Sequence, residues 1–182
     1  MIQEKVSENE VLETNPTVEG IEMSLDMDSL SVIMHTLSKN LYADPIGSSI
    51  RETTSNGLDS KRRSGSDKPI IVSLYKNTQD NYEFAVEDFG TGLDDDDVRN
   101  IISKYGKSTK RNSNTELGMF GLGFKAPLAY SSSFYFVCRK DGVERKYMMF
   151  EGEEVNSIDL LYETTTTECN GVKVIIPVKY SD

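Results

Sequence analysis

The stretch IRETTSNGLDSKRR, residues 50–63, is the feature that most constrains this chain. It concentrates Thr, Ser, Asn and Gly, and each of these is a weaker helix former than Ala. On a helical wheel, Glu52, Asn56 and Asp59 fall within about 60° of one another and form a polar stripe. Ile50 and Leu58, together with Thr54, lie on the roughly opposite side, so we expect them to face the core. Either the polar stripe is solvated or it is the wall of a pocket.

A second cluster follows an apolar, strand-like run. In EDFGTGLD, residues 87–94, Asp88 is followed by Gly90 and Gly92. A turn alone would explain this pattern, because glycine permits positive φ and aspartate often begins a loop.

A third cluster, GMFGLGF at residues 118–124, places Gly118, Gly121 and Gly123 just before an expected helix. Glycines in that position let backbone N–H groups approach phosphate oxygens, with the positive end of the helix behind them. The cluster lacks the βαβ context of a dinucleotide fingerprint, and no Walker P-loop pattern occurs.

Length, charge and cysteine content exclude several classes of protein. A chain of 182 residues is most simply one domain, and its net charge of −10 argues against broad nucleic-acid binding. No apolar run is long enough to cross a bilayer, and the N-terminus is not signal-like. These two features predict an intracellular, cytoplasmic protein. Cys138 and Cys169 lack metal-ligand spacing, so we expect reduced thiols and no zinc. The sole histidine, His35, is expected to be structural.

The hydropathy pattern predicts an α+β sandwich, with one mostly antiparallel mixed sheet and helices on one face. Residues 1–18 are acidic and aperiodic, as in a flexible arm, and residues 19–182 form the domain. The expected elements, in order, are a strand near 21–25, a helix over 28–41, the helix that contains residues 50–63, strands at 70–75 and 82–88, a helix after Asp94, a mobile loop at 105–117, a helix that opens near Gly121, a hairpin at 133–150 with Asp141 and Gly142 at its turn, and strands at 157–163 and 171–177.

The order of the three clusters is more specific than any one of them. ExxxNxxD on a helix, DxGxG after a strand and GxxGxG after a loop together resemble the GHKL, or Bergerat-fold, ATPases, and the similarity extends from about Ile21 to Pro177. Within that superfamily, LYADPIGSSIRETTSNGLDS, GLGFKAPLAYSSSF and NGVKVIIPV look most like the rIIA proteins of T-even-type bacteriophages. The resemblance implies a GHKL two-layer fold that binds ATP and Mg²⁺. For the phage branch it implies protection of an infected cell against premature lysis or host exclusion.

The resemblance also implies roles for individual residues. Glu52 matches the general base, Asn56 the Mg²⁺ ligand, and Asp88 the acceptor for the adenine amine. The remaining nucleotide-binding positions that the resemblance implies are Asp59, Gly90, Gly92, Lys107, Gly118, Phe120, Gly121, Leu122 and Gly123, with residues 105–123 as a lid that closes on nucleotide. Lys125 either contacts phosphate or faces solvent.

Two departures from the family pattern affect the expected function. Many members carry a threonine in a late GT pair, where this chain has Gly171 and Val172, and Asn170 is a possible substitute. The chain also ends after the sandwich, without the second domain that supplies a phosphate-binding lysine in gyrase-like and MutL-like relatives. Hydrolysis is therefore expected to be slow or absent in this chain alone, which is either a fragment or mainly a nucleotide-switched binder.

Two hypotheses about function remain open. The first is a Mg²⁺-dependent ATPase whose lid switches a surface for a phage or host protein. The second is a non-hydrolysing phage interaction protein stabilised by nucleotide. In either case the expected location is the host cytoplasm, or the surface of the inner membrane. The N-terminal arm is either a mobile segment or one that joins two protomers in a homodimer. No direct contact with nucleic acid is expected.

Overall fold

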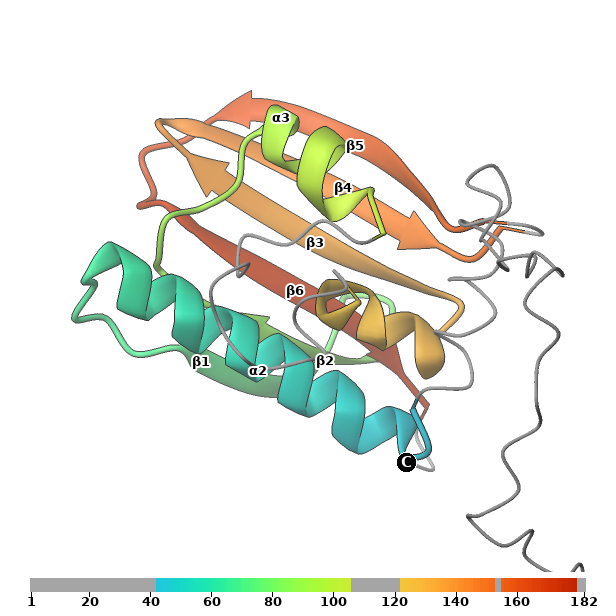
Figure 1. The fold of residues 1–182 in the computed structure, drawn as a ribbon. Coiled ribbons are helices and arrows are strands. Elements are labelled where there is room, and N and C mark those ends of the chain that lie inside the picture. The colour runs from blue at the N-terminus through green and yellow to red at the C-terminus, as the bar shows by residue number, and fades with distance from the viewer. Residues whose placement is uncertain (1–41, 106–121, 153–154, 180–182) are drawn as a thin grey trace, which may run out of the picture.

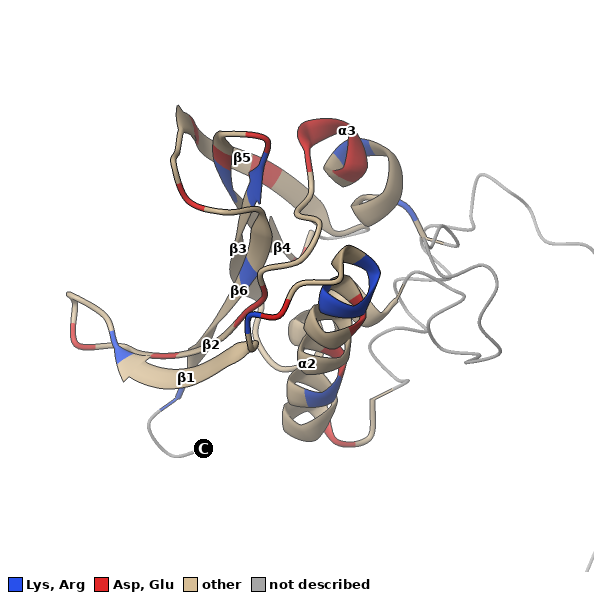
Figure 2. Cartoon of the chain, turned by 90° about the vertical axis from the view of Figure 1, so that its left-hand side faces the viewer, with Lys and Arg blue, Asp and Glu red and all other residues tan. Residues whose placement is uncertain are grey.

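The computed structural model describes residues 42–105, 122–152 and 155–179. Within these ranges a six-stranded sheet carries helices on one face (Figure 1), and the side view in Figure 2 separates the two layers. The strand order is β1-β2-β6-β3-β4-β5, and every pairing between described strands is antiparallel. The predicted α+β sandwich is therefore confirmed.

Helix α2, Pro45–Ser64, has a clear sequence signal at each end. The Asp44 side chain accepts a hydrogen bond from the Gly47 backbone at 2.9 Å, and Pro45 occupies the first turn. Gly65 ends the helix in the left-handed region, with φ of 68°. The last turn holds Lys61, Arg62 and Arg63, which suit the negative end of the helix dipole and lie at that end in Figure 2.

The face of α2 that packs on the sheet differs from the expected one. Ile50 and Leu58 are 42% and 38% exposed, and Thr54 is half-buried. The residues of α2 that are buried are Ser48, Ser49, Thr53, Gly57 and Ser60. Small residues are needed there because α2 lies close to β2: a β-carbon on Gly57 would be 3.4 Å from that of Asp88. The expectation that Ile50, Thr54 and Leu58 line the core was wrong.

Buried hydroxyls on α2 find partners within the helix. Thr53 Oγ1 donates to the Ser49 carbonyl at 2.6 Å, and Ser49 Oγ donates to the Pro45 carbonyl at 2.7 Å. These bonds offset the cost of removing the hydroxyls from water. The weak helix formers in this stretch are thus explained in part by close packing on the sheet.

The strands match the sequence prediction closely. They are β1 Ile71–Lys76, β2 Tyr82–Glu87, β3 Ser133–Lys140, β4 Val143–Phe150, β5 Ser157–Thr165 and β6 Gly171–Val178. Asp141 and Gly142 turn β3 into β4 with φ of 54° and 81°, as a two-residue hairpin turn requires. The predicted strand near 21–25, the helix over 28–41, the N-terminal arm and His35 lie outside the described residues.

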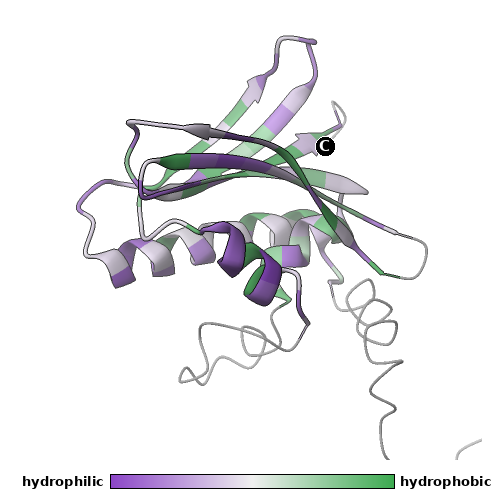
Figure 3. Cartoon of the chain, turned by 90° about the horizontal axis from the view of Figure 1, so that it is seen from above, coloured by the Kyte–Doolittle hydropathy of each residue, from purple (hydrophilic) through white to green (hydrophobic). Residues whose placement is uncertain are grey.

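Two short helices complete the layer over the sheet (Figure 3). Helix α3, Asp95–Asp97, begins with a capping box between Asp94 and Asp97 and continues as the π-helix η1, Val98–Ile102. The 3₁₀ helix η2, Gly123–Ala129, follows the GxxGxG cluster, and α2 packs against it.

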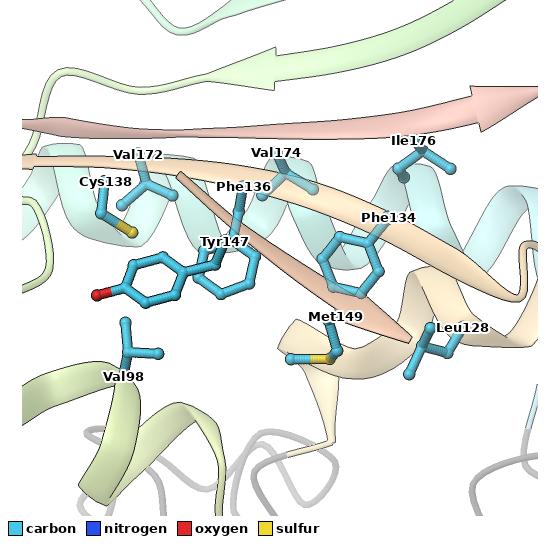
Figure 4. Close-up of a cluster of buried hydrophobic side chains, with 10 residues drawn as sticks. All are labelled: Val98, Leu128, Phe134, Phe136, Cys138, Tyr147, Met149, Val172, Val174 and Ile176. Atoms are coloured by element: carbon cyan, nitrogen blue, oxygen red, sulfur yellow. The ribbon is translucent and has the colours of Figure 1, made fainter. Parts of the chain in front are cut away.

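The core lies between the sheet and these short helices (Figure 4). Phe136 stacks on Tyr147 with ring centroids 5.1 Å apart, and Phe124 of η2 meets Phe136 edge-on at 5.1 Å. Cys138 is a free, buried thiol within this cluster, so its expected structural role fits its position. The core fixes η2, and with it Gly123, relative to the sheet.

Candidate functional site

Asp88 follows the last residue of β2 and points toward α2. Its backbone N–H donates to the Val172 carbonyl of β6 at 2.9 Å, which continues the sheet register by one residue. Its side chain therefore emerges on the helix-covered face, as that of Val86 does. Asp88 is 5% exposed, so the residue chosen from the DxGxG pattern is a buried carboxyl group.

Two donors hold the Asp88 carboxylate. The Gly90 backbone N–H donates to Oδ1 at 2.9 Å, and the Ser60 hydroxyl of α2 donates a second hydrogen bond. Burial raises the pKa of Asp88 above its ordinary value of 3.8, while these two bonds, the Val172 contact and the charge of Arg63 act in the opposite direction. The outcome is a carboxyl group in a dry, well-ordered position at one end of the polar stripe.

Glycines bring the loop, the helix and β6 into close contact around Asp88. A β-carbon on Gly90 would lie 2.1 Å from Ser60 Oγ, and one on Gly171 would lie 2.1 Å from the Asp88 carbonyl oxygen. Gly92 has a positive φ of 68°, and a β-carbon on it would lie 2.0 Å from the Arg139 carbonyl oxygen. The turn interpretation and the binding interpretation of DxGxG are therefore compatible, since the same glycines make the turn and let the loop hold the Asp88 carboxylate close to α2.

The other end of the stripe meets the last glycine of the GxxGxG cluster. A β-carbon on Gly123 would lie 2.8 Å from Glu52 Oε2 and 3.9 Å from Asn56 Nδ2. Arg51 Nε lies 3.5 Å from Glu52 Oε1, and the Glu52 side chain is 17% exposed. The start of η2 thus faces the carboxylate and the amide that the sequence singled out, and residues 71 positions apart come together.

The structure places the other predicted site residues as follows. Asp59 is partly exposed and forms an i,i+3 ion pair with Arg62 at 3.6 Å. Leu122 is buried, and its carbonyl accepts the Lys125 backbone N–H at 2.9 Å. The remaining predicted positions, Lys107, Gly118, Phe120 and Gly121, lie outside the described residues, as does nearly all of the predicted lid.

Lys125 does not face solvent. It is 5% exposed, its Nζ donates to the Lys104 carbonyl at 3.1 Å, and it lies 4.9 Å from the centre of the Tyr105 ring. Burial lowers its pKa from 10.5 to about 8. The solvent-exposed alternative was wrong, because the aliphatic stem and ammonium group pack under η1.

Asn170 does not replace the late threonine of the family. Its Oδ1 accepts the Asp141 backbone N–H at 2.9 Å, so its side chain is engaged at the β3–β4 turn. The hydroxyl that reaches Asp88 belongs to Ser60, which the sequence analysis missed. A signal was present: Ser60 follows Asn56 by four residues, one helical turn further along the same side.

A cavity of about 340 Å³ lies under η1, apart from these residues. It is lined by Asp95, Val98, Arg99, Ser103, Tyr105, Lys125, Tyr147, Met149, Asn156, Ile158 and Leu160. Neither Asp88 nor any residue of α2 lines it. The candidate site is the region where the motifs meet on α2, and this cavity lies apart from it.

The donor set of α2 suits a magnesium ion bound mainly by phosphate and water. No group of three or more His, Cys, Asp and Glu residues within the described ranges is arranged to hold a metal. Asn56 has one amide oxygen, and the Asn56 and Glu52 side chains lie together beside Gly123. Magnesium is often held by one or two protein oxygens plus substrate phosphates.

Among the helices that the structure describes, none has the length and apolarity to span a membrane.

These features define a class of protein: an α+β sandwich in which a helix on one face of the sheet is contacted by two glycine-containing motifs. The sequence profile of the histidine kinase-, DNA gyrase B- and HSP90-like ATPases matches residues 46–173, which is more than half of the chain. The chain belongs to this family, whose domains bind ATP. No curated protein matches it.

Proposed function

We propose that this chain binds Mg²⁺ and ATP along α2 and hydrolyses the nucleotide. The observation that carries the proposal is the position of the two motif contacts. Asp88 meets α2 at Gly57 and Ser60, and Gly123 meets it at Glu52 and Asn56. Glu52 and Ser60 are eight residues apart, or about 12 Å along the helix axis. A base-recognising end and a phosphate-binding end are thereby separated on one rigid element.

Each proposed role follows from the chemistry of the side chain. Asp88, with donors on two sides, accepts a hydrogen bond from the exocyclic amine of adenine. Asn56 is the proposed magnesium ligand, and bound magnesium would supply charge neutralisation on the β- and γ-phosphates. Glu52 orients the attacking water and takes its proton. Gly123 has no side chain, so the phosphate end can approach the carboxylate of Glu52 and the amide of Asn56.

The test is a calorimetric titration with ATP and a non-hydrolysable ATP analogue, with and without Mg²⁺, alongside a phosphate-release assay. We expect wild type to bind both nucleotides, Asp88→Asn to bind neither, and Glu52→Ala to bind ATP without releasing phosphate. Glu163→Gln is the control: it lies on β5, an edge strand of the sheet, its side chain is 53% exposed, and the variant should match wild type. Failure of wild type to bind either nucleotide would overturn the proposal.

A second candidate keeps the binding and removes the turnover. In that case the chain is an interaction protein that nucleotide stabilises, and Glu52→Ala should leave its biological activity intact. It is favoured by the late Gly171–Val172 pair, which lacks the threonine that many members of the family carry. Phosphate release by wild type above the level of Glu52→Ala separates the two candidates.

The biological setting is a further part of the proposal. The resemblance to rIIA proteins of T-even-type phages supports a role in protecting an infected cell from premature lysis, through a protein partner in the cytoplasm or at the inner membrane. Complementation of a phage that lacks its rIIA gene would test this role, with Asp88→Asn as the negative control. The lid assigned to residues 105–123 and the dimerising arm at residues 1–18 lie almost entirely outside the described residues and stay predictions.

A further inference from the structure

Ser60 faces Asp88 across the closest approach between α2 and the DxGxG loop. The residue is 7% exposed, and its hydroxyl donates to the Asp88 carboxylate. A β-carbon on Gly90 would lie only 2.1 Å from Ser60 Oγ, so the loop backbone packs directly against this hydroxyl. The hydroxyl is therefore enclosed between the helix and the loop, and its position depends on both.

The two donors reach the carboxylate from different elements. The Gly90 N–H belongs to the loop that carries Asp88, whereas the Ser60 hydroxyl belongs to α2. An ionised carboxylate has about four acceptor sites, so two donors fix its plane and leave capacity for a further donor. A hydrogen bond from a fixed element makes one orientation of Asp88 much more favourable than the others.

We propose that Ser60 is a specificity-determining residue, whose hydroxyl holds Asp88 as a hydrogen-bond acceptor for the 6-amino group of a purine nucleotide. The inference rests on the proposed function, in which Asp88 contacts the base. Ser60 acts through Asp88 and is a positioning residue. It supplies the hydroxyl that other members of the family place on a late strand, where this chain has Gly171 and Val172.

The physical reason concerns which bases the site rejects. An acceptor fixed in a buried site discriminates strongly against a ligand that lacks the matching donor, because the acceptor then stays unpaired. Guanine presents an oxygen at the same ring position, so it would face the carboxylate with a second acceptor. A carboxyl group free to rotate or to take up a proton would tolerate either base. Donation by Ser60 disfavours both changes.

The experiment compares three ligands on wild type and Ser60→Ala by calorimetry with Mg²⁺. They are ATP, purine riboside 5′-triphosphate, which has hydrogen in place of the 6-amino group, and GTP. Wild type should bind ATP at least about tenfold more tightly than the other two. Ser60→Ala should lose about tenfold in affinity for ATP and less than about twofold for purine riboside triphosphate.

Two further variants separate positioning from folding. Ser64→Ala, in the same helix, removes an exposed hydroxyl that donates to the Lys61 carbonyl, and it should match wild type for all three ligands. Ser60→Cys keeps the size of the side chain and a weak donor, so its preference for ATP should lie between those of Ser60→Ala and wild type. Thermal unfolding of each variant reports whether the fold is intact.

Three outcomes would overturn the inference. Equal losses for ATP and purine riboside triphosphate in Ser60→Ala would mean that Ser60 only supports the fold. Unchanged affinities would mean that Asp88 needs no second donor. Failure of wild type to bind any of the three ligands would instead overturn the proposed function, and the inference with it. The first two results leave ATP binding by wild type intact, so the two failures are distinguishable.

Discussion

Gly123 faces the Glu52 carboxylate so closely that a β-carbon on the glycine would lie 2.8 Å from Oε2. This relationship joins the third motif of the sequence to the first. Because the atom approached is the end of a flexible side chain, Glu52 can move away, and the backbone need not.

We therefore predict that Gly123→Ala changes ATP turnover more than stability. The free energy of unfolding should fall by less than about 1 kcal/mol, while phosphate release should fall at least tenfold, because displacing a reacting group by about 1 Å can cost about 100-fold in rate. Urea denaturation and a phosphate-release assay measure the two effects. In a Glu52→Ala background the same substitution should cause no further loss of turnover, and an additional loss there would contradict the proposed role of Glu52.

At Gly90 the same kind of substitution should act on the fold. A β-carbon there would lie 2.6 Å from the backbone carbon of Ser60 as well as near its hydroxyl, so the loop or the helix must shift. We expect Gly90→Ala to lower the free energy of unfolding by about 1–3 kcal/mol and to weaken ATP binding. Gly65→Asn is the matched control, since nothing lies within 4 Å of a β-carbon at that position and Asn tolerates positive φ. Equal stability of Gly90→Ala and wild type would show that the loop does not pack on α2 as described.

The sequence predicts the described strands and helices well because their signals are local. Asp44 and Pro45 at the start of α2, and Asp141 and Gly142 at the β3–β4 turn, specify conformation through their own backbones. The antiparallel sheet follows from short turns between neighbouring strands. The place of β6 between β2 and β3 comes from long-range pairing, and no local signal specified it.

The candidate site was predicted less completely, for a physical reason. Glu52, Asn56 and Asp88 could be found because their types and order are distinctive. Ser60 could not, because its role depends on how close the loop comes to α2, and Gly90 determines that distance only in three dimensions. The buried face of α2 was misassigned for a related reason: hydrophobicity favoured Ile50 and Leu58, whereas close packing selected small residues.

The ion pair between Arg139 and Glu87 should contribute more to stability than an exposed pair does. Arg139 of β3 pairs with Gly171 of β6 in the sheet register, and its guanidinium bonds to Glu87 of β2. The two side chains are 10% and 17% exposed. Arg139→Leu leaves a mostly buried carboxylate whose other cation, Lys173, lies 3.8 Å away, so we expect a loss of about 2–3 kcal/mol in urea denaturation.

Arg99→Leu is the comparison for Arg139→Leu. Arg99 pairs with Asp95 on the surface and is 68% exposed, so its removal should cost much less stability than the removal of Arg139. Similar losses for the two variants would mean that the Arg139–Glu87 pair is solvated.

Asp88→Asn should raise stability while abolishing adenine binding. Burial raises the pKa of Asp88 above 3.8, so the folded protein holds this proton more tightly than the unfolded chain does. The free energy of unfolding therefore falls as the pH rises from 3.8 through the folded pKa. An asparagine at this position avoids that loss of stability, and its side-chain oxygen can still accept a hydrogen bond from the Gly90 N–H.

Chemical denaturation across this pH range measures the effect. Asp88→Asn should be more stable than wild type at neutral pH, and this difference should disappear in acid. A variant that is less stable at every pH would contradict this explanation.

Lys125→Met should show a difference in stability that depends on pH in the alkaline range. Burial lowers the pKa of Lys125 to about 8, so between pH 8 and 10.5 the unfolded chain holds a proton that the folded protein has released. Wild type should therefore gain stability with respect to this group as the pH rises through that window. Methionine has a similar length and carries no charge, but it loses the bond to the Lys104 carbonyl and the contact with Tyr105. We expect the variant to be more stable than wild type by about 1 kcal/mol at pH 7, with the advantage lost near pH 10.5.

Lys146→Met is the control for this prediction. It removes a similar cation–ring contact with Tyr135 from a half-buried lysine, so it reports the loss of the ring contact alone at pH 7. A constant difference between Lys125→Met and wild type at both pH values would mean that burial of the ammonium group carries no cost, and that its hydrogen bond and ring contact replace water fully.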